Sequence, residues 1–189
     1  MNLPNKLTVA RVILVPFFVF TLMANFIPQN YIISLVLFAA ASYTDHLDGK
    51  IARRDHLITN FGKFMDPLAD KILVMAALIC FVALGFTNPY FVIIIMFREF
   101  AVTSVRLVAA ANGTVIAANN WGKAKTVSQI IAIIVILLLQ YILQLDLIDN
   151  CNTLFYIIGE VFMGVCTLLA LISGIIYLKD NWQAVADFK

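Results

Sequence analysis

Long apolar stretches, separated by short polar breaks, run along almost the whole chain. No charged residue occurs between Val12 and Thr44, and Pro28-Gln29-Asn30 divides this stretch in two. A membrane-spanning helix needs about 20 mostly apolar residues. Further breaks at Thr87-Asn88-Pro89 and Asn112-Gly113 are typical turn signals. The pattern predicts an all-α fold of six spans, the first ending near Ile27 and the others covering about 31–52, 62–86, 90–111, 125–145 and 153–178.

The composition supports a single membrane domain over residues 1–189. Hydrophobic residues make up 62% of the chain and charged residues only 13%, against roughly 25% in typical soluble domains. This excludes a disordered chain, a coiled coil and an ordinary soluble enzyme. A net charge of +2 without a basic stripe gives no reason to expect nucleic-acid binding. Cys80, Cys151 and Cys166 form neither a disulfide framework nor a zinc site.

Among the connections between the predicted helices, only every second one contains lysine or arginine, which predicts the orientation. They lie at the N-terminus, in the second–third and fourth–fifth connections and in the tail: Lys6, Arg11, Arg53, Arg54, Lys63, Lys123, Lys125, Lys179 and Lys189. The connections around Gln29, Asn88 and Asp149 contain none. By the positive-inside rule, we expect a multi-pass cell-membrane protein with a short interfacial N-terminal segment and both termini in the cytoplasm.

Four aspartates lie near the predicted cytoplasmic ends of the second and third helices. Asp45 and Asp48 are spaced i, i+3, and Asp66 and Asp70 are spaced i, i+4, so each pair shares a helix face. Because a short connection makes these helices antiparallel neighbours, we expect the four carboxylates to converge.

Four carboxylates in a low dielectric repel one another unless cations lie between them. Oxygen ligands favour hard ions such as Mg²⁺ or Mn²⁺, and four suit two divalent ions that clamp a phosphoryl group. A proton relay, as in a small cation transporter, and a salt-bridged structural cluster are the alternatives.

Small residues accompany the aspartates. Gly49, Ala52 and Gly62 would let a ligand approach the backbone closely, or simply let helices pack. Arg53 could reach a diphosphate, or could be an interfacial anchor.

Together these residues form the pattern Asp45-x2-Asp48-Gly49-x2-Ala52-Arg53-x8-Gly62-x3-Asp66-x3-Asp70. It resembles the full motif of the CDP-alcohol phosphotransferases, a family of six-helix membrane enzymes. The resemblance implies that Asp45, Asp48 and Asp66 bind two metal ions, and that Asp70 binds one of them and is the general base. It also implies that Gly49, Arg53 and Thr59 contact the CDP-linked lipid. The polar stripe Asn5, Thr8 and Arg11 resembles a segment that borders the nucleotide; an interfacial helix face is the alternative.

Residues 98–106 and the opening Leu3-Pro4-Asn5-Lys6-Leu7-Thr8 resemble the bacterial phosphatidylglycerophosphate synthases of this family. The resemblance implies transfer of a phosphatidyl group from CDP-diacylglycerol to glycerol 3-phosphate, with release of CMP, by a homodimer. Arg98 and Arg106 share a helix face, and with Lys123 and Lys125 they could form a cationic pocket for a phosphorylated acceptor. Pairing of Arg98 with Glu99, with snorkelling of the basic side chains, is the alternative. The same chemistry with another acceptor, as in cardiolipin or phosphatidylinositol-phosphate synthesis, also remains open.

Overall fold

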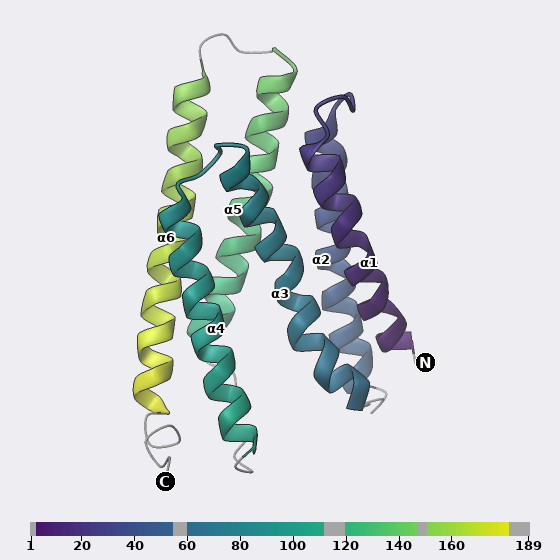
Figure 1. Cartoon of the computed structure of the whole chain (residues 1–189), viewed down its shortest axis with the longest axis vertical. Helices are drawn as coiled ribbons and strands as arrows, with labels where there is room; N and C mark the ends of the chain where they lie inside the picture. The colour runs from purple at the N-terminus through teal and green to yellow at the C-terminus, as the bar shows by residue number, and fades with distance from the viewer. Residues whose placement is uncertain (1–2, 55–59, 112–119, 147–150, 182–189) are drawn as a thin grey trace. The chain divides into compact units, whose positions relative to one another are not determined.

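The computed structural model describes residues 3–54, 60–111, 120–146 and 151–181. These residues form six helices and no strands (Figure 1). The helices are α1 (Leu3–Met23), α2 (Asn30–Arg54), α3 (Asn60–Ala83), α4 (Pro89–Ala111), α5 (Asn120–Gln144) and α6 (Asn152–Asp180). Within them, the side chains of residues 3–5, 7, 45–54, 60–68, 70, 110, 111 and 120 lie outside the description. The predicted all-α class is confirmed for the described residues.

Two helix ends differ from the sequence prediction. Helix α1 ends at Met23 rather than near Ile27, because the Asn30 side chain donates a hydrogen bond to the carbonyl of Leu22 (3.2 Å). This bond satisfies one of the carbonyls that a helix end leaves unpaired. Helix α5 begins at Asn120, well before Lys125. The sequence prediction started at the apolar run and left out the polar first turns, which are also helical.

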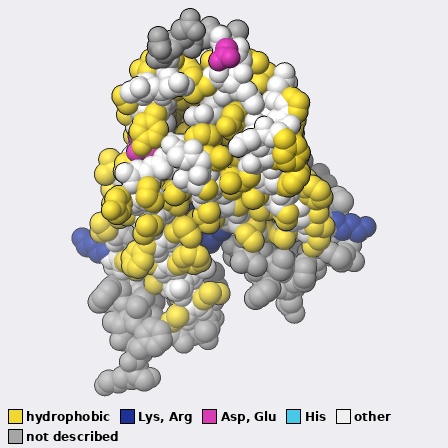
Figure 2. Space-filling model, turned by 45° about the horizontal axis from the view of Figure 1, so that its top comes forward, with side chains coloured by type: hydrophobic (Ala, Val, Ile, Leu, Met, Phe, Trp, Pro, Cys, Tyr) yellow, Lys and Arg dark blue, Asp and Glu magenta, His cyan; other side chains and the backbone are white. Residues whose placement is uncertain are grey.

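Within the residues that the structure describes, two helical segments, Trp121–Gln144 and Asn152–Asp180, are long and apolar enough to cross a membrane. Helix α4 is not among them, and it carries Arg98, Glu99 and Arg106. Large hydrophobic side chains are exposed on most helices, and Figure 2 shows how far they cover one face of the molecule. Soluble proteins rarely expose apolar surface on this scale, so these features indicate a membrane protein.

The chain divides into two compact units. The first comprises Met1–Gly85 and Ile133–Phe155, and the second comprises Phe86–Ala132 and Tyr156–Lys189. Helices α1, α2 and α3 therefore belong to the first unit, and α4 and most of α6 belong to the second.

In the first unit, α1 packs against both α2 and α3 (Figure 1). Fully buried residues from these helices form its core, including Phe18, Leu22, Phe38, Ala69 and Phe81. Asn30, which is 1% exposed, also accepts a hydrogen bond from the Gln144 side chain (3.0 Å). One buried amide thus joins the end of α1, the start of α2 and the end of α5.

In the second unit, polar contacts align α4 with α6 in parallel. Near the start of α4, Glu160 Oε1 accepts hydrogen bonds from Thr87 Oγ1 and the Asn88 backbone N–H, both 2.8 Å. Further along, Arg98 reaches Ser173, and then Arg106 reaches Tyr177. Residue numbers rise together on both helices, as a parallel pair requires. Glu160 also places a negative charge where the helix dipole of α4 is positive.

Candidate functional site

The four aspartates all lie on helical backbone. Asp45 and Asp48 lie in the last turns of α2, and Asp66 and Asp70 lie in the first turns of α3. The chain segment from residue 54 to residue 60 can span at most about 22 Å at ~3.6 Å per residue. Helices α2 and α3 also contact each other, so these two helix ends lie on the same side of the first unit. The aspartate side chains lie outside the described residues, and convergence of the carboxylates stays a prediction.

Two polar residues of α1 are buried in the first unit. Thr8 is 1% exposed and Arg11 is 2% exposed, on a helix that packs against α2 and α3. A buried guanidinium is costly unless its charge is compensated, so Arg11 must be balanced by polar or charged groups close to it. The Asn5 side chain and the whole of Thr59 lie outside the described residues, as do the side chains of Gly49, Ala52, Arg53 and Gly62.

A buried ion-pair cluster lies in the second unit. Arg98 Nη1 donates a hydrogen bond to Glu99 Oε1 (2.7 Å), and Lys125 Nζ contacts the same oxygen. The side chains of Arg98, Glu99 and Lys125 are only 10%, 7% and 4% exposed. The Arg98–Glu99 pair, considered from the sequence as the alternative to acceptor binding, is therefore present, and Lys125 joins it from α5.

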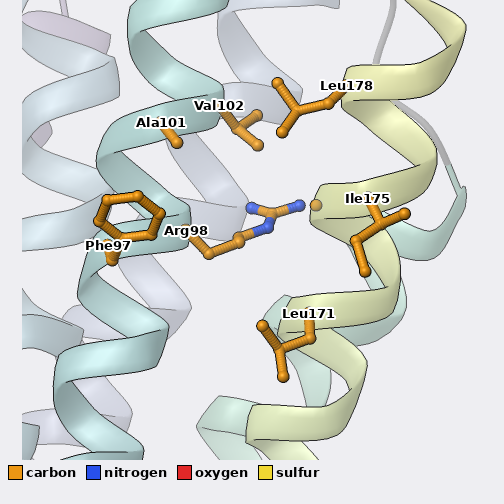
Figure 3. Close-up of a pocket in the computed structure, with 8 residues that line it drawn as sticks. Phe97, Arg98, Ala101, Val102, Leu171, Ile175 and Leu178 are labelled. Atoms are coloured by element: carbon orange, nitrogen blue, oxygen red, sulfur yellow. The ribbon is translucent and has the colours of Figure 1, made fainter.

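Arg98 also crosses to α6. Its Nη2 donates a hydrogen bond to Ser173 Oγ (2.8 Å). Figure 3 shows the side chain reaching from α4 toward α6 in a pocket of about 130 Å³, whose other lining includes Leu171 and Ile175. Gly174 provides the space, because a Cβ at that position would lie 2.9 Å from Arg98 Cγ.

The other two basic residues are exposed. Arg106 Nε donates a hydrogen bond to Tyr177 Oη (3.2 Å), and its Cζ lies 5.3 Å from the centre of the Tyr177 ring. Lys123 is exposed on the first turn of α5. The four predicted acceptor residues thus divide into a buried pair held by Glu99 and two residues that are open to solvent or headgroups.

The comparisons with known proteins agree with the motif. Residues 1–178 match the family model described as CDP-alcohol phosphatidyltransferase. The chain belongs to this family. The resemblance of its acidic motif to the CDP-alcohol phosphotransferases is therefore confirmed.

Several bacterial proteins are similar to this chain over most or nearly all of their length. A Bacillus subtilis protein is 42% identical over 195 residues, covering 97% of each chain. A Rickettsia bellii protein is 33% identical and covers 94% of each chain, and a Mycoplasma pneumoniae protein is 32% identical, covering 97% of this chain and 89% of its own. All three carry the name CDP-diacylglycerol–glycerol-3-phosphate 3-phosphatidyltransferase.

Sequence reasoning missed the residues of α6 that contact α4 in this family member. Ser173, Gly174 and Tyr177 lie in an almost uniformly apolar helix and belong to no recognisable motif. A partial signal existed, because three residues able to meet an arginine fall within five positions. Their importance became visible only once the register of α6 against α4 was known.

The crossing of Arg98 over Gly174 leads to a testable prediction about stability. The matched control is Gly164→Ala on the same helix, whose Cβ would meet only Phe91 Cζ at 3.9 Å. Alanine is favoured over glycine within a helix by about 1 kcal/mol, so this control should be neutral or stabilising. Gly174→Ala forces Arg98 away from its anchors, and overpacking of this kind costs about 1–3 kcal/mol. We expect the midpoint of thermal unfolding in detergent to be roughly 2–12 °C lower for Gly174→Ala than for Gly164→Ala. Equal midpoints would contradict the tight crossing.

Proposed function

We propose that this chain is an integral membrane enzyme that transfers the phosphatidyl group of CDP-diacylglycerol to glycerol 3-phosphate, giving phosphatidylglycerophosphate and CMP. The observation that carries the proposal is the complete acidic motif on α2 and α3, within a family match over residues 1–178. The names of relatives that are 32–42% identical support the same donor and acceptor.

The donor set fits two divalent cations, Mg²⁺ or Mn²⁺. Asp45, Asp48, Asp66 and Asp70 supply only carboxylate oxygens, and their helical spacing places each pair on one face. Bound cations would neutralise the negative charge on the diphosphate oxygens and so make the phosphorus under attack more electrophilic. Asp70 accepts the proton of the acceptor's primary hydroxyl. The hydroxyl oxygen then bonds to the lipid-side phosphorus while the bond from that phosphorus to the CMP oxygen breaks.

The CDP-linked lipid is held by residues of the first unit. They are Asn5, Thr8 and Arg11 on α1, Gly49, Ala52 and Arg53 on α2, Gly62 on α3, and Thr59. The burial of Thr8 and Arg11 supports this assignment, because their helix packs against α2 and α3. A guanidinium in such a position suits a ligand phosphate as well as a carboxylate.

The acceptor phosphate is bound by Arg98, Arg106, Lys123 and Lys125. The exposed residues Arg106 and Lys123 contact it directly, while the buried Arg98 and Lys125 contribute positive potential. Basic residues in this number suit a phosphomonoester acceptor.

All six helices span the membrane as a single domain over residues 1–189. They contain 21 to 29 residues, long enough to cross about 30 Å of hydrocarbon at 1.5 Å per residue. Both termini and the active site face the cytoplasm, and resemblance to the family favours a homodimer.

The reaction can be tested with purified protein in mixed micelles. We expect CMP release from CDP-diacylglycerol only when glycerol 3-phosphate is added, and not with glycerol, phosphatidylglycerol or inositol phosphate. Glycerol is the matched control, because it offers the same primary hydroxyl without the phosphate. Faster turnover with phosphatidylglycerol or inositol phosphate would replace the proposed acceptor. Cation flux without CMP release would favour the transporter alternative.

The carboxylates are expected to act in two ways. Asp45→Ala, Asp48→Ala and Asp66→Ala should each abolish nearly all turnover, and excess EDTA should do the same to the wild-type protein. Asp70→Asn keeps the shape but removes the base, a loss typically worth about 10²–10⁴-fold in rate, while CDP-diacylglycerol still binds. Expression and membrane insertion of each variant are the controls. Full activity in EDTA would contradict metal dependence, and wild-type turnover by Asp70→Asn would assign the base elsewhere.

The topology can be tested by labelling single cysteines in a variant that lacks the three native ones. Phe26→Cys and Asn152→Cys replace exposed residues at predicted outer connections, whereas Lys123→Cys and Lys179→Cys replace exposed residues at predicted inner ones. In intact cells a membrane-impermeant maleimide should label only the outer pair, and all four should react after permeabilisation. Labelling of Lys123→Cys from outside would overturn the six-span arrangement.

A further inference from the structure

Arg106 is the exposed arginine of the basic face of α4, and one aromatic residue holds it. Its Nε donates a hydrogen bond to the Tyr177 hydroxyl (3.2 Å), and its Cζ lies 5.3 Å from the ring centre. Tyr177 is itself only 3% exposed, so its ring is fixed by the packing of α6. The main chain is fixed as well, because the Tyr177 carbonyl accepts hydrogen bonds from the Asn181 backbone N–H (3.2 Å) and side-chain Nδ2 (2.8 Å).

This arrangement uses only part of the guanidinium. The Tyr177 hydroxyl accepts the Nε–H and the ring lies beside Cζ, whereas Nη1 and Nη2 make no hydrogen bond or ion pair in the part of the chain that the structure describes. The edge formed by these two nitrogens is the edge that binds two oxygens of a phosphate at once. Arg98 differs, because Glu99 and Ser173 occupy both of its terminal nitrogens.

We propose that Tyr177 is a positioning residue, which holds Arg106 so that its two terminal nitrogens face the phosphate monoester of the acceptor. The inference rests on the proposed function for the identity of the acceptor, but the coupling of the two residues stands on their contacts. An arginine side chain that is ordered before binding loses less conformational freedom when the phosphate arrives. The hydroxyl and the ring therefore contribute to acceptor affinity without touching the acceptor.

A phosphate at this position has two possible sources, the acceptor and a lipid headgroup. Both carry phosphate oxygens that could bind the same edge of the guanidinium. A headgroup could reach this edge because α4 ends close to the predicted membrane surface. Acceptor binding affects the Michaelis constant for glycerol 3-phosphate and the inhibition constant of inorganic phosphate. Headgroup binding instead affects the dependence of activity on anionic lipid, so the two sources give different results.

The test is a kinetic comparison of Tyr177→Phe, Tyr177→Leu, Arg106→Lys and Arg106→Ala in mixed micelles. Tyr177→Phe keeps the ring and removes the hydroxyl, so the Michaelis constant for glycerol 3-phosphate should rise about 2- to 10-fold. Tyr177→Leu removes both contacts and should raise it about 10- to 100-fold. Arg106→Ala should raise it about 10- to 1000-fold, and Arg106→Lys should raise it because lysine lacks the two-nitrogen edge.

Inhibition by inorganic phosphate should weaken in parallel in all four variants. The Michaelis constant for CDP-diacylglycerol should stay near its wild-type value, because neither residue is assigned to the CDP-linked lipid. Tyr156→Phe is the matched control, since Tyr156 lies on the same helix, is 43% exposed and should change neither constant.

A double variant separates positioning from a purely structural role. If Tyr177 acts through Arg106, adding Tyr177→Phe to Arg106→Ala should cause no further rise in the Michaelis constant. The proposal would be overturned if the two substitutions raised the Michaelis constant for glycerol 3-phosphate multiplicatively in the double variant. It would also be overturned if the constant for CDP-diacylglycerol rose equally, or if Tyr177→Leu kept wild-type inhibition by phosphate. A changed dependence on anionic lipid with unchanged acceptor constants would overturn it as well.

Two further outcomes remain informative. If Tyr177→Leu does not fold, Tyr177→Phe and Arg106→Lys still test the coupling through phosphate inhibition. If the wild-type enzyme prefers another acceptor, the proposed function fails alone, because inhibition by inorganic phosphate reports on Arg106 whichever acceptor is used.

Discussion

A charged group in apolar surroundings must find its counter-charge within the protein, and in the second unit Glu99 provides it. One oxygen of this carboxylate contacts both Arg98 of α4 and Lys125 of α5, while Arg98 continues to Ser173 of α6. The cluster therefore fixes the rotation of α4 about its axis. Arg106 lies two turns further along the same face, about 12 Å at 1.5 Å per residue, and reaches Tyr177 because that rotation is fixed.

A glycine on α6 provides the space that the Arg98 side chain needs. Gly174 lets the Arg98 side chain pass across α6, and no other residue type would leave that path open. Between membrane helices, hydrogen bonds contribute only about 0.6 kcal/mol on average, so no single contact holds α4 to α6. The register of α6 against α4 instead comes from several contacts along the two helices. The first joins Glu160 of α6 to Asn88 just before α4, and the last joins Tyr177 of α6 to Arg106 of α4.

The sequence predicted the helices well and the contacts between them poorly. Apolar length and turn signals located all six helices in the described residues, with errors only at ends such as Met23 and Asn120, where side-chain capping and polar helical turns decide the boundary. The acidic motif was recognisable because the spacing within each of its two halves, on α2 and on α3, follows from the geometry of a single helix. The role of Tyr177 was not, because α6 is apolar on all sides and its pattern does not reveal which face meets α4.

The basic residues of the second unit differ in burial, because Arg98 and Lys125 are buried whereas Arg106 is exposed. Arg98 and Lys125 cannot release Glu99 without leaving a charge unpaired in an apolar interior, which costs about 3–5 kcal/mol of a total stability of about 5–15 kcal/mol. Substitutions there act on the fold before they act on a ligand. Arg106 can exchange partners at its exposed edge with little cost, since Tyr177 holds only its Nε. Helix α4 thus carries two kinds of arginine, Arg98 buried and paired, and Arg106 exposed and oriented by Tyr177.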